Sequence, residues 1–299
     1  MANLILDTGN TFHKSERSDQ VSLFKGRFRG NVKMKDFNGD NHCRTTKYTA
    51  QMANLILDTG NTFHKIAVIG VDNTVLEERI VADLTADELD SLISKYAPSK
   101  AIVSSTRGDM ARSAQLLEKR VGYVLCLDGR TPLPIEVDYD RARLGTDRVA
   151  AAVGAVTEYG ADRRILVVDA GTAITFDLVD CGRFVGGNIS PGVDMRLEAL
   201  HEKTATLPLC SPKPLGDSAT SVGRTTVEAI ENGVMEGVFY EVKGYIDTFC
   251  KENDDMLIIF IGGDAEYFVN RIKNAIFASR NIMYSGLNRI LEYNAAQEK

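Results

Sequence analysis

Two short turns of one kind, DTGNT at 58–62 and DAGTAIT at 169–175, decide the fold of this chain. Each turn follows a run of apolar residues typical of a buried strand, and a second strand-like stretch follows each turn. Each unit is therefore predicted to be a β-hairpin with an Asp-x-Gly tip. One such turn is a weak indication, since Asp and Gly are common in hairpin loops. Two copies, 111 residues apart, favour a shared function.

The residue types in these turns suit a phosphate. Glycine lets a turn bring backbone N–H groups close to an anion, and threonines add hydroxyl donors. Asp58 and Asp169 can hold a phosphate-bound metal ion directly or through water. Two such turns facing each other would bind the phosphates of a nucleotide triphosphate. The hydroxyl donors are Thr62, Thr172 and Thr175.

The paired turns resemble those of the sugar kinase, actin and Hsp70 superfamily, in which each of two ribonuclease H-like lobes contributes one hairpin. This resemblance implies an α/β fold of two such lobes with an interlobe nucleotide cleft. Five further segments follow, in order, the pattern of type III pantothenate kinases, and the resemblance covers Met52 to about Asn294. The segments are Leu144–Arg148, Gly186–Gly192, Gly223–Ile230, Gly262–Ala265 and Gly286–Asn288.

The family resemblance implies ATP-dependent phosphorylation of pantothenate to 4′-phosphopantothenate, the first step of coenzyme A biosynthesis, by a homodimer with the pantothenate pocket near the subunit interface. It implies magnesium at Asp58, through phosphate or water, and potassium or ammonium at Asp169. The implied ATP and phosphate contacts are Asp58, Thr59, Gly60, Asn61, Thr62, Lys65, Gly171, Thr172, Thr175, Gly262 and Gly263. The implied pantothenate contacts are Gly145, Thr146, Asp147, Arg148 and Thr226.

Asp147 is expected to be the catalytic residue. Phosphoryl transfer needs an aligned alcohol, a neutralised triphosphate and a carboxylate that accepts the alcohol proton. Arg148 beside it can bind a carboxylate with two hydrogen bonds, and pantothenate has both a primary hydroxyl and a carboxylate. An isolated Asp-Arg pair at a helix start would be better explained as a surface ion pair. The order of the motifs reverses that preference.

Composition limits the remaining possibilities. The chain has 299 residues, 44% hydrophobic, and a formal net charge of −6. This charge argues against general nucleic-acid binding, which usually requires a basic surface. No apolar stretch approaches the roughly 20 residues of a membrane span, and there is no secretory leader, so the expected location is cytoplasmic. Five scattered cysteines and four histidines show no spacing typical of a disulfide framework or a zinc site.

The first 14 residues recur without change at 52–65. Structural repeats within a fold do not keep identical sequences, so residues 1–51 are interpreted as a non-native or disordered leader. Two ribonuclease H-like lobes follow, predicted over 52–160 and 161–299. Predicted strands are 65–70, 75–81, 101–105, 124–128, 174–179, 183–189 and 256–261, and predicted helices are 86–96, 193–202 and 225–249. The last helix has an apolar stripe expected to form core or dimer surface: Val227, Ile230, Val234, Val238, Val242 and Ile246.

Three alternatives bear on the predicted function. Gly223-Arg224-Thr225 is not a P-loop, because Gly216 is too distant and Arg replaces the required Lys. A nucleotide-binding transcriptional accessory factor is one rival function, and a kinase of a sugar or another small alcohol is the second. The family's usual Pro-containing loop is absent after Tyr139, so the role of this tyrosine is left open.

Overall fold

The structure is a computed structural model that describes residues 53–60, 63–106, 110–212, 222–251, 255–269, 271–272, 275–277 and 281–298, with backbone alone for 275–277. The described residues all belong to one compact unit. The predicted leader, 1–51, lies outside the described residues, as do Asn61 and Thr62.

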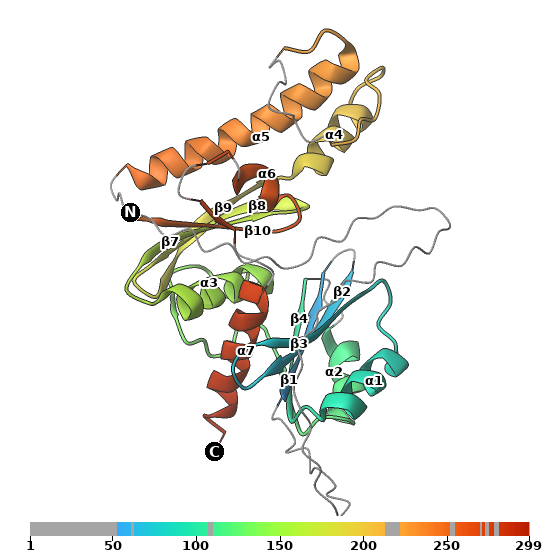
Figure 1. The fold of residues 1–299 in the computed structure, drawn as a ribbon, viewed down its shortest axis with the longest axis vertical. Helices are drawn as coiled ribbons and strands as arrows, with labels where there is room; N and C mark the ends of the chain where they lie inside the picture. The colour runs from blue at the N-terminus through green and yellow to red at the C-terminus, as the bar shows by residue number, and fades with distance from the viewer. Residues whose placement is uncertain are drawn as a thin grey trace, which may run out of the picture. The chain divides into compact units, whose positions relative to one another are not determined.

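The first DTGNT-type hairpin is the centre of a five-stranded sheet with the order β3-β2-β1-β4-β5 (Figure 1). Strand β1 is antiparallel to β2 and parallel to β4. Apolar side chains of β1, β2 and β4 form a buried core with helices α1 and α2. The elements are β1 Ala53–Thr59, β2 His64–Gly70, β3 Val75–Val81, α1 Ala86–Tyr96, β4 Lys100–Ser105, α2 Met110–Glu118 and β5 Tyr123–Cys126.

The second hairpin repeats this topology in a sheet with the order β11-β10-β7-β8-β9-β6. Strand β7 is antiparallel to β8 and parallel to β10, as β1 is to β2 and β4. The order β9-β8-β7-β10-β11 thus reproduces β3-β2-β1-β4-β5, which confirms the predicted two-lobed α/β fold. The strands are β6 Glu136–Val137, β7 Arg164–Ala170, β8 Ala173–Asp180, β9 Arg183–Pro191, β10 Leu257–Ile261 and β11 Ala275–Phe277.

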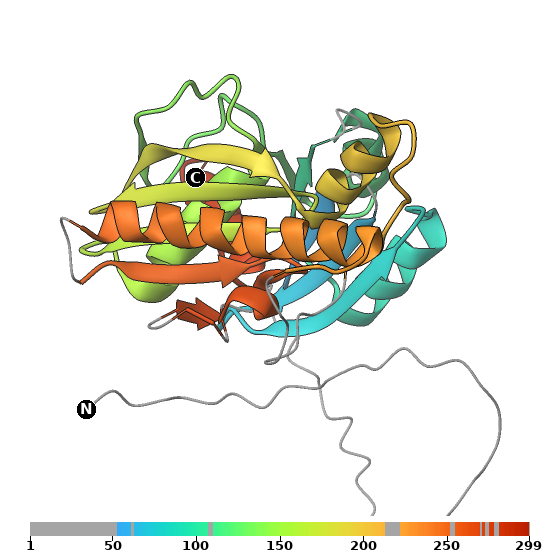
Figure 2. The same ribbon diagram turned by 90° about the horizontal axis from the view of Figure 1, so that it is seen from above.

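One face of the second sheet is covered by the long helix α5, Thr226–Cys250 (Figure 2). Its buried side chains share a core with Phe176, Phe260 and Phe268, together with α4, Val193–Glu202, and α6, Ala265–Val269. Five members of the predicted stripe are buried: Ile230, Val234, Val238, Val242 and Ile246. Val227 is 40% exposed.

Helices α3, Thr146–Tyr159, and α7, Asn281–Ala295, pack against each other through glycines (Figure 1). A Cβ on Gly154 would lie 2.0 Å from the Ile282 carbonyl oxygen, and one on Gly286 would lie 1.9 Å from the Ala150 oxygen. Only glycine permits this close approach. Because α7 also packs on β1 and β4, the C-terminal helix contacts the first sheet. The lobe boundary at residue 160 stays a prediction.

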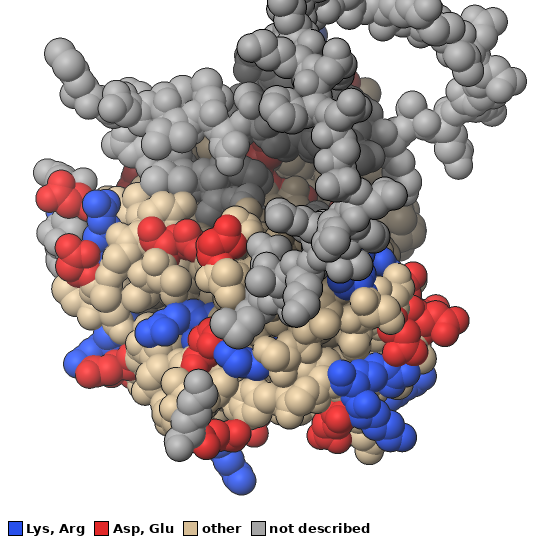
Figure 3. Space-filling view, turned by 60° about the horizontal axis from the view of Figure 1, so that its bottom comes forward, with Lys and Arg blue, Asp and Glu red and all other residues tan. Residues whose placement is uncertain are grey.

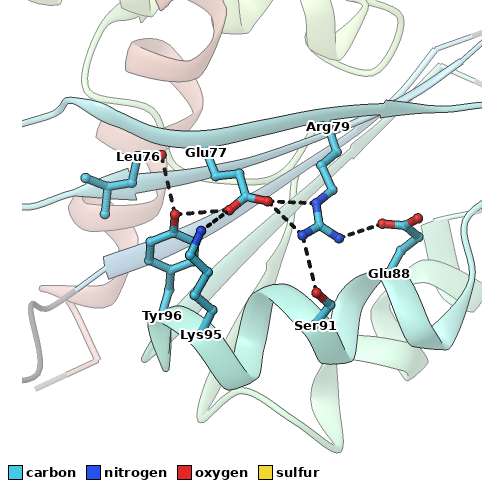
Figure 4. A network of polar contacts seen from close by, with 7 residues as sticks. All are labelled: Leu76, Glu77, Arg79, Glu88, Ser91, Lys95 and Tyr96. Carbon is cyan, nitrogen blue, oxygen red and sulfur yellow. Dashed lines mark hydrogen bonds and ion pairs between the residues drawn. The ribbon is translucent and has the colours of Figure 1, made fainter.

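Helix α1 is joined to β3 by a half-buried polar network (Figure 4). The Glu77 carboxylate accepts hydrogen bonds from Arg79, Lys95 and Tyr96, and Arg79 also donates to Glu88. On the face shown in Figure 3, Lys and Arg side chains alternate with Asp and Glu side chains. In the described part of the chain, no helix has both the length and the apolar character needed to cross a membrane.

Candidate active site

In both hairpin turns the glycine N–H donates to a backbone oxygen near the start of the following strand, three residues on in the first turn and two residues on in the second. The Gly60 N–H donates to the Phe63 oxygen across 3.1 Å, and the Gly171 N–H donates to the Ala173 oxygen, also across 3.1 Å. These bonds hold the glycines within their turns. An aspartate lies near the end of the strand that precedes each turn, Asp58 on β1 and Asp169 on β7.

The first turn of α3 lies beside the first sheet. The Ser104 hydroxyl, near the end of β4, donates to the Thr146 hydroxyl across 3.0 Å. Gly145 is the N-cap of α3, and a Cβ on it would lie 2.4 Å from Asp147 Oδ1. The missing side chain therefore leaves room for the Asp147 carboxylate, which accepts a hydrogen bond from the Arg148 N–H at 2.8 Å.

Three aspartates from three elements interact electrostatically: Asp58 of β1, Asp147 of α3 and Asp169 of β7. We call them the carboxylate cluster. Burial, and next the Asp147 charge, raise the pKa of Asp169 to about 6. Burial also raises the pKa of Asp58, opposed by Lys65, whose ammonium lies 3.9 Å from Asp58 Oδ2. Lys65 is the one cation among the described residues that lowers the pKa of both Asp58 and Asp169, so three carboxylates face one ammonium group. An excess of negative charge suits cations and their phosphate complexes.

The donor set favours cations held jointly with a substrate. Within the described ranges, no three or more His, Cys, Asp or Glu side chains converge in a group that could hold a metal ion. Magnesium in nucleotide sites commonly takes one or two carboxylates and completes its shell with phosphate oxygens and water. Asp58 and Asp169, each contributing one carboxylate beside a predicted phosphate turn, fit this arrangement.

The second Asp-x-Gly turn packs closely against the end of β10. Gly262 has φ +95°, and a Cβ on it would lie 2.2 Å from the Ala170 oxygen and 2.5 Å from Asp169 Oδ1. The Asp264 N–H donates to the same Ala170 oxygen across 3.0 Å. Gly263 has open space where a Cβ would stand. The predicted ATP contacts Gly262 and Gly171 are thus brought to one place.

Thr226 lies apart from these residues in the described contacts. It is exposed at the first position of α5, and the neighbouring Thr225 caps the helix by accepting a hydrogen bond from the Glu228 N–H at 3.2 Å. In the described part of the chain, no hydrogen bond or ion pair joins Thr226 to the carboxylate cluster.

Arg148 has a partner that the sequence did not reveal. Its Nε and Nη2 donate to Asp177 Oδ1 at 2.9 and 2.5 Å, and both side chains are buried. Thr175, a predicted phosphate contact, donates its hydroxyl to Asp177 Oδ2 at 3.1 Å. The available signal in the sequence was Asp177, which stands between the apolar residues Phe176 and Leu178 in the middle of the strand ITFDLVD at 174–180. The sequence gave no comparable indication that the Ser104 hydroxyl would bond to Thr146.

Known proteins similar to this chain identify its family. The family model described as type III pantothenate kinase matches residues 54–248. A type III pantothenate kinase of Bacteroides fragilis is 41% identical over 245 residues, covering 81% of this chain and 98% of that protein. The chain belongs to the type III pantothenate kinase family. As a family member it is a kinase that phosphorylates pantothenate with ATP, at the first step of coenzyme A biosynthesis.

Further relatives and solved structures extend this result. A type III pantothenate kinase of Porphyromonas gingivalis is 37% identical over 242 residues, covering 81% of this chain and 98% of that protein. A Campylobacter jejuni structure, named as a Baf family transcriptional activator, has a TM-score of 0.54 at 20% identity, covering 81% of this chain and 99% of its own. A Sinorhizobium meliloti structure, named as a 2-dehydro-3-deoxygalactonokinase, has a TM-score of 0.51 at 15% identity, covering 80% and 98%. These two structures support the family's fold.

Proposed function

We propose that Asp147 is the general base that accepts the proton of the pantothenate primary hydroxyl as this oxygen attacks the γ-phosphorus of ATP. The observation that supports the proposal is the carboxylate cluster, in which the charge of Asp147 at the start of α3 raises the pKa of an aspartate in the Asp-x-Gly turn of each sheet. Gly145 leaves room beside the Asp147 carboxylate. Such a base needs to be within hydrogen-bond reach of the attacking hydroxyl when the substrates are bound.

The phosphates of ATP lie, in this proposal, between the two turns. Among the described residues, the proposed ATP and phosphate contacts are Asp58, Thr59, Gly60, Lys65, Gly171, Thr172, Thr175, Gly262 and Gly263. The Thr175 hydroxyl also donates a hydrogen bond to Asp177. Asn61 and Thr62 belong to the same proposed site but lie outside the described residues. Lys65 supplies a positive charge close to Asp58. It therefore offsets part of the negative charge that the triphosphate brings.

Two cations complete the proposed site. Asp58 would hold magnesium through phosphate or water, and Asp169 would hold potassium or ammonium. When bound, these ions neutralise phosphate charge and so lower the electrostatic cost of phosphoryl transfer. Among the described residues, Lys65 is the one cation that lowers the pKa of the half-buried Asp169 carboxylate. This supports the assignment, because an ionised carboxylate in such surroundings gains most from a further positive partner.

The proposed pantothenate site includes Gly145, Thr146 and Arg148 with Asp147, and Thr226 at the start of α5. Because Thr226 is exposed and apart from the cluster in the described contacts, we propose that it acts near the interface of a homodimer. Exposed apolar side chains of β9 and α5 support such an interface: Val185, Ile189, Val227 and Tyr240. The proposed location of the enzyme is the cytoplasm.

A panel of acceptors tests the acceptor assignment. The full chain would be incubated with ATP, magnesium and potassium and with either pantothenate or N-acetylglucosamine, and the phosphorylated products measured. We expect 4′-phosphopantothenate and no sugar phosphate. Phosphorylation of the sugar would favour a different small-alcohol kinase, and ATP binding without turnover of either acceptor would favour a regulator.

A further inference from the structure

A buried ion pair joins the first turn of α3 to the middle of β8, and the proposed chemistry does not use its acidic member. Asp177 is 1% exposed and Arg148 is 6% exposed. Burial raises the pKa of Asp177 and the Arg148 guanidinium opposes this effect, so the pair is stable in its charged form only while both partners are present.

The surroundings of the pair fit a planar guanidinium held in one orientation. The Tyr139 and Phe184 rings lie 5.3 and 5.6 Å from the Arg148 Cζ atom, and they meet each other edge to face. Gly187 stands directly opposite Asp177 on β9. A Cβ on Gly187 would lie 2.4 Å from Asp177 Oδ1 and 2.7 Å from Arg148 Nη2. The absence of a side chain at Gly187 therefore provides the space that the pair occupies.

The same contacts connect the two halves of the proposed site. Thr175 pairs across the hairpin with Asp169 and donates its hydroxyl to Asp177. Asp177 binds Arg148, whose backbone N–H donates to Asp147. A continuous series of contacts thus runs from the proposed cation ligand to the proposed base.

A role in positioning explains this arrangement better than a role in stability. Buried ion pairs contribute little net stability, because the loss of hydration offsets the attraction between the charges. Two hydrogen bonds from adjacent nitrogens to one oxygen instead fix the direction of the guanidinium plane, as no single contact could. Fixing the plane also fixes the direction of the N–H groups on its opposite edge, which are the donors suited to a substrate carboxylate.

We propose that Asp177 is a positioning residue that holds Arg148 so that the enzyme selects acceptors bearing a carboxylate. This inference rests on the proposed function, in which Arg148 binds the carboxylate of pantothenate. Asp177 touches no substrate in this proposal. It acts through Arg148, with Tyr139, Phe184 and Gly187 restricting where the guanidinium can go.

The test compares pantothenate with pantothenol, which has the same primary hydroxyl but an alcohol in place of the carboxylate. The full chain would carry Asp177→Asn, with kcat and KM measured for pantothenate and for ATP, and the inhibition constant measured for pantothenol. We expect kcat/KM for pantothenate to fall by about 30-fold or more, mainly through KM. The inhibition constant of pantothenol and the KM for ATP should change by less than about threefold.

Asp180→Asn is the matched control. Asp180 lies on the same strand and forms an ion pair with Arg164 at 3.6 Å, with 41% of its side chain exposed. Because a solvent-exposed ion pair of this kind contributes little to stability, kcat, both KM values and the inhibition constant of pantothenol should stay within about twofold of the parent values. Equal weakening of pantothenate and pantothenol by Asp177→Asn would overturn the inference, as would unchanged kcat/KM for pantothenate.

A second variant applies if Asp177→Asn fails to fold. Arg148→Lys keeps the charge but cannot make both hydrogen bonds, and it should lose the same preference for pantothenate over pantothenol. Retention of that preference would overturn the inference. An inactive parent enzyme would instead contradict the proposed function, so the two failures are distinguishable.

Discussion

The contact between α3 and α7 leaves no room for a side chain at Gly154, and Gly154→Ala should therefore affect both stability and catalysis. The new Cβ would lie 2.0 Å from the Ile282 oxygen, whereas ordinary contacts begin at 3.4 Å, so the helices must separate locally by 1.4 Å, the difference between these distances. Such overpacking typically costs about 1–3 kcal/mol. Because α3 begins with Thr146 and Asp147, we expect the proposed general base, Asp147, to shift by about 1 Å. A shift of this size is expected to lower kcat by about 100-fold.

Chemical denaturation would give the free energy of unfolding, and steady-state kinetics would give kcat at saturating substrates. Gly244→Ala in α5 is the control, because Gly244 is exposed and a Cβ added there would meet no atom within 4 Å beyond its own stretch of helix. Alanine there should be neutral or stabilise by up to about 1 kcal/mol, as expected for an open helix position. A Gly154→Ala enzyme as stable and active as this control would refute the proposed helix contact.

Three further outcomes are expected. Replacing potassium with sodium should lower activity if Asp169 holds the monovalent cation, and equal rates in both salts would contradict that assignment. Glu77→Gln should lower the free energy of unfolding by about 1 kcal/mol at pH 7, after allowance for solvent screening of the ion pairs of Glu77. Lys95 and Arg79 lower the folded-state pKa of Glu77 from 4.5 to about 2. This stabilisation is therefore complete above about pH 4.5 and is lost as the pH falls towards 2. A difference in unfolding free energy between the parent and the variant that persists at about pH 2 would contradict this reasoning. Removing residues 1–51 should preserve folding and activity, because the family match begins at residue 54; loss of soluble, active protein would show that the leader is required.

Local patterns in the sequence predicted much of the fold. The bounds of β3, α1 and α4 match the predicted ranges 75–81, 86–96 and 193–202. These elements have clear periodicity and, in α1, a threonine N-cap whose side chain accepts from the Glu88 N–H. Strand β5 ends at Cys126, two residues before the predicted end at 128. Strand ends depend on the partner strand, which local sequence does not specify.

The acidic residues of the candidate site were predictable, and their partners were not. Asp58 and Asp169 stand in repeated turns, and Asp147 in a recognisable motif, so sequence alone singled them out. The partnership of Asp177 with Arg148 arises only when β8 and the first turn of α3 are brought together. The roles of Gly154 and Gly187 likewise depend on how closely backbones from separate elements approach. Such long-range contacts leave no periodic signal in the chain.

The most direct test of the central claim is pantothenate-dependent phosphoryl transfer by the parent enzyme and by Asp147→Asn at saturating ATP and pantothenate, with ATP affinity measured in parallel. The account predicts that kcat falls by about 100-fold or more while ATP affinity stays within about threefold, because the variant removes the proposed proton acceptor and leaves the two proposed phosphate-binding turns intact. Unchanged kcat in a variant that binds ATP normally would contradict the assignment of Asp147 as the base.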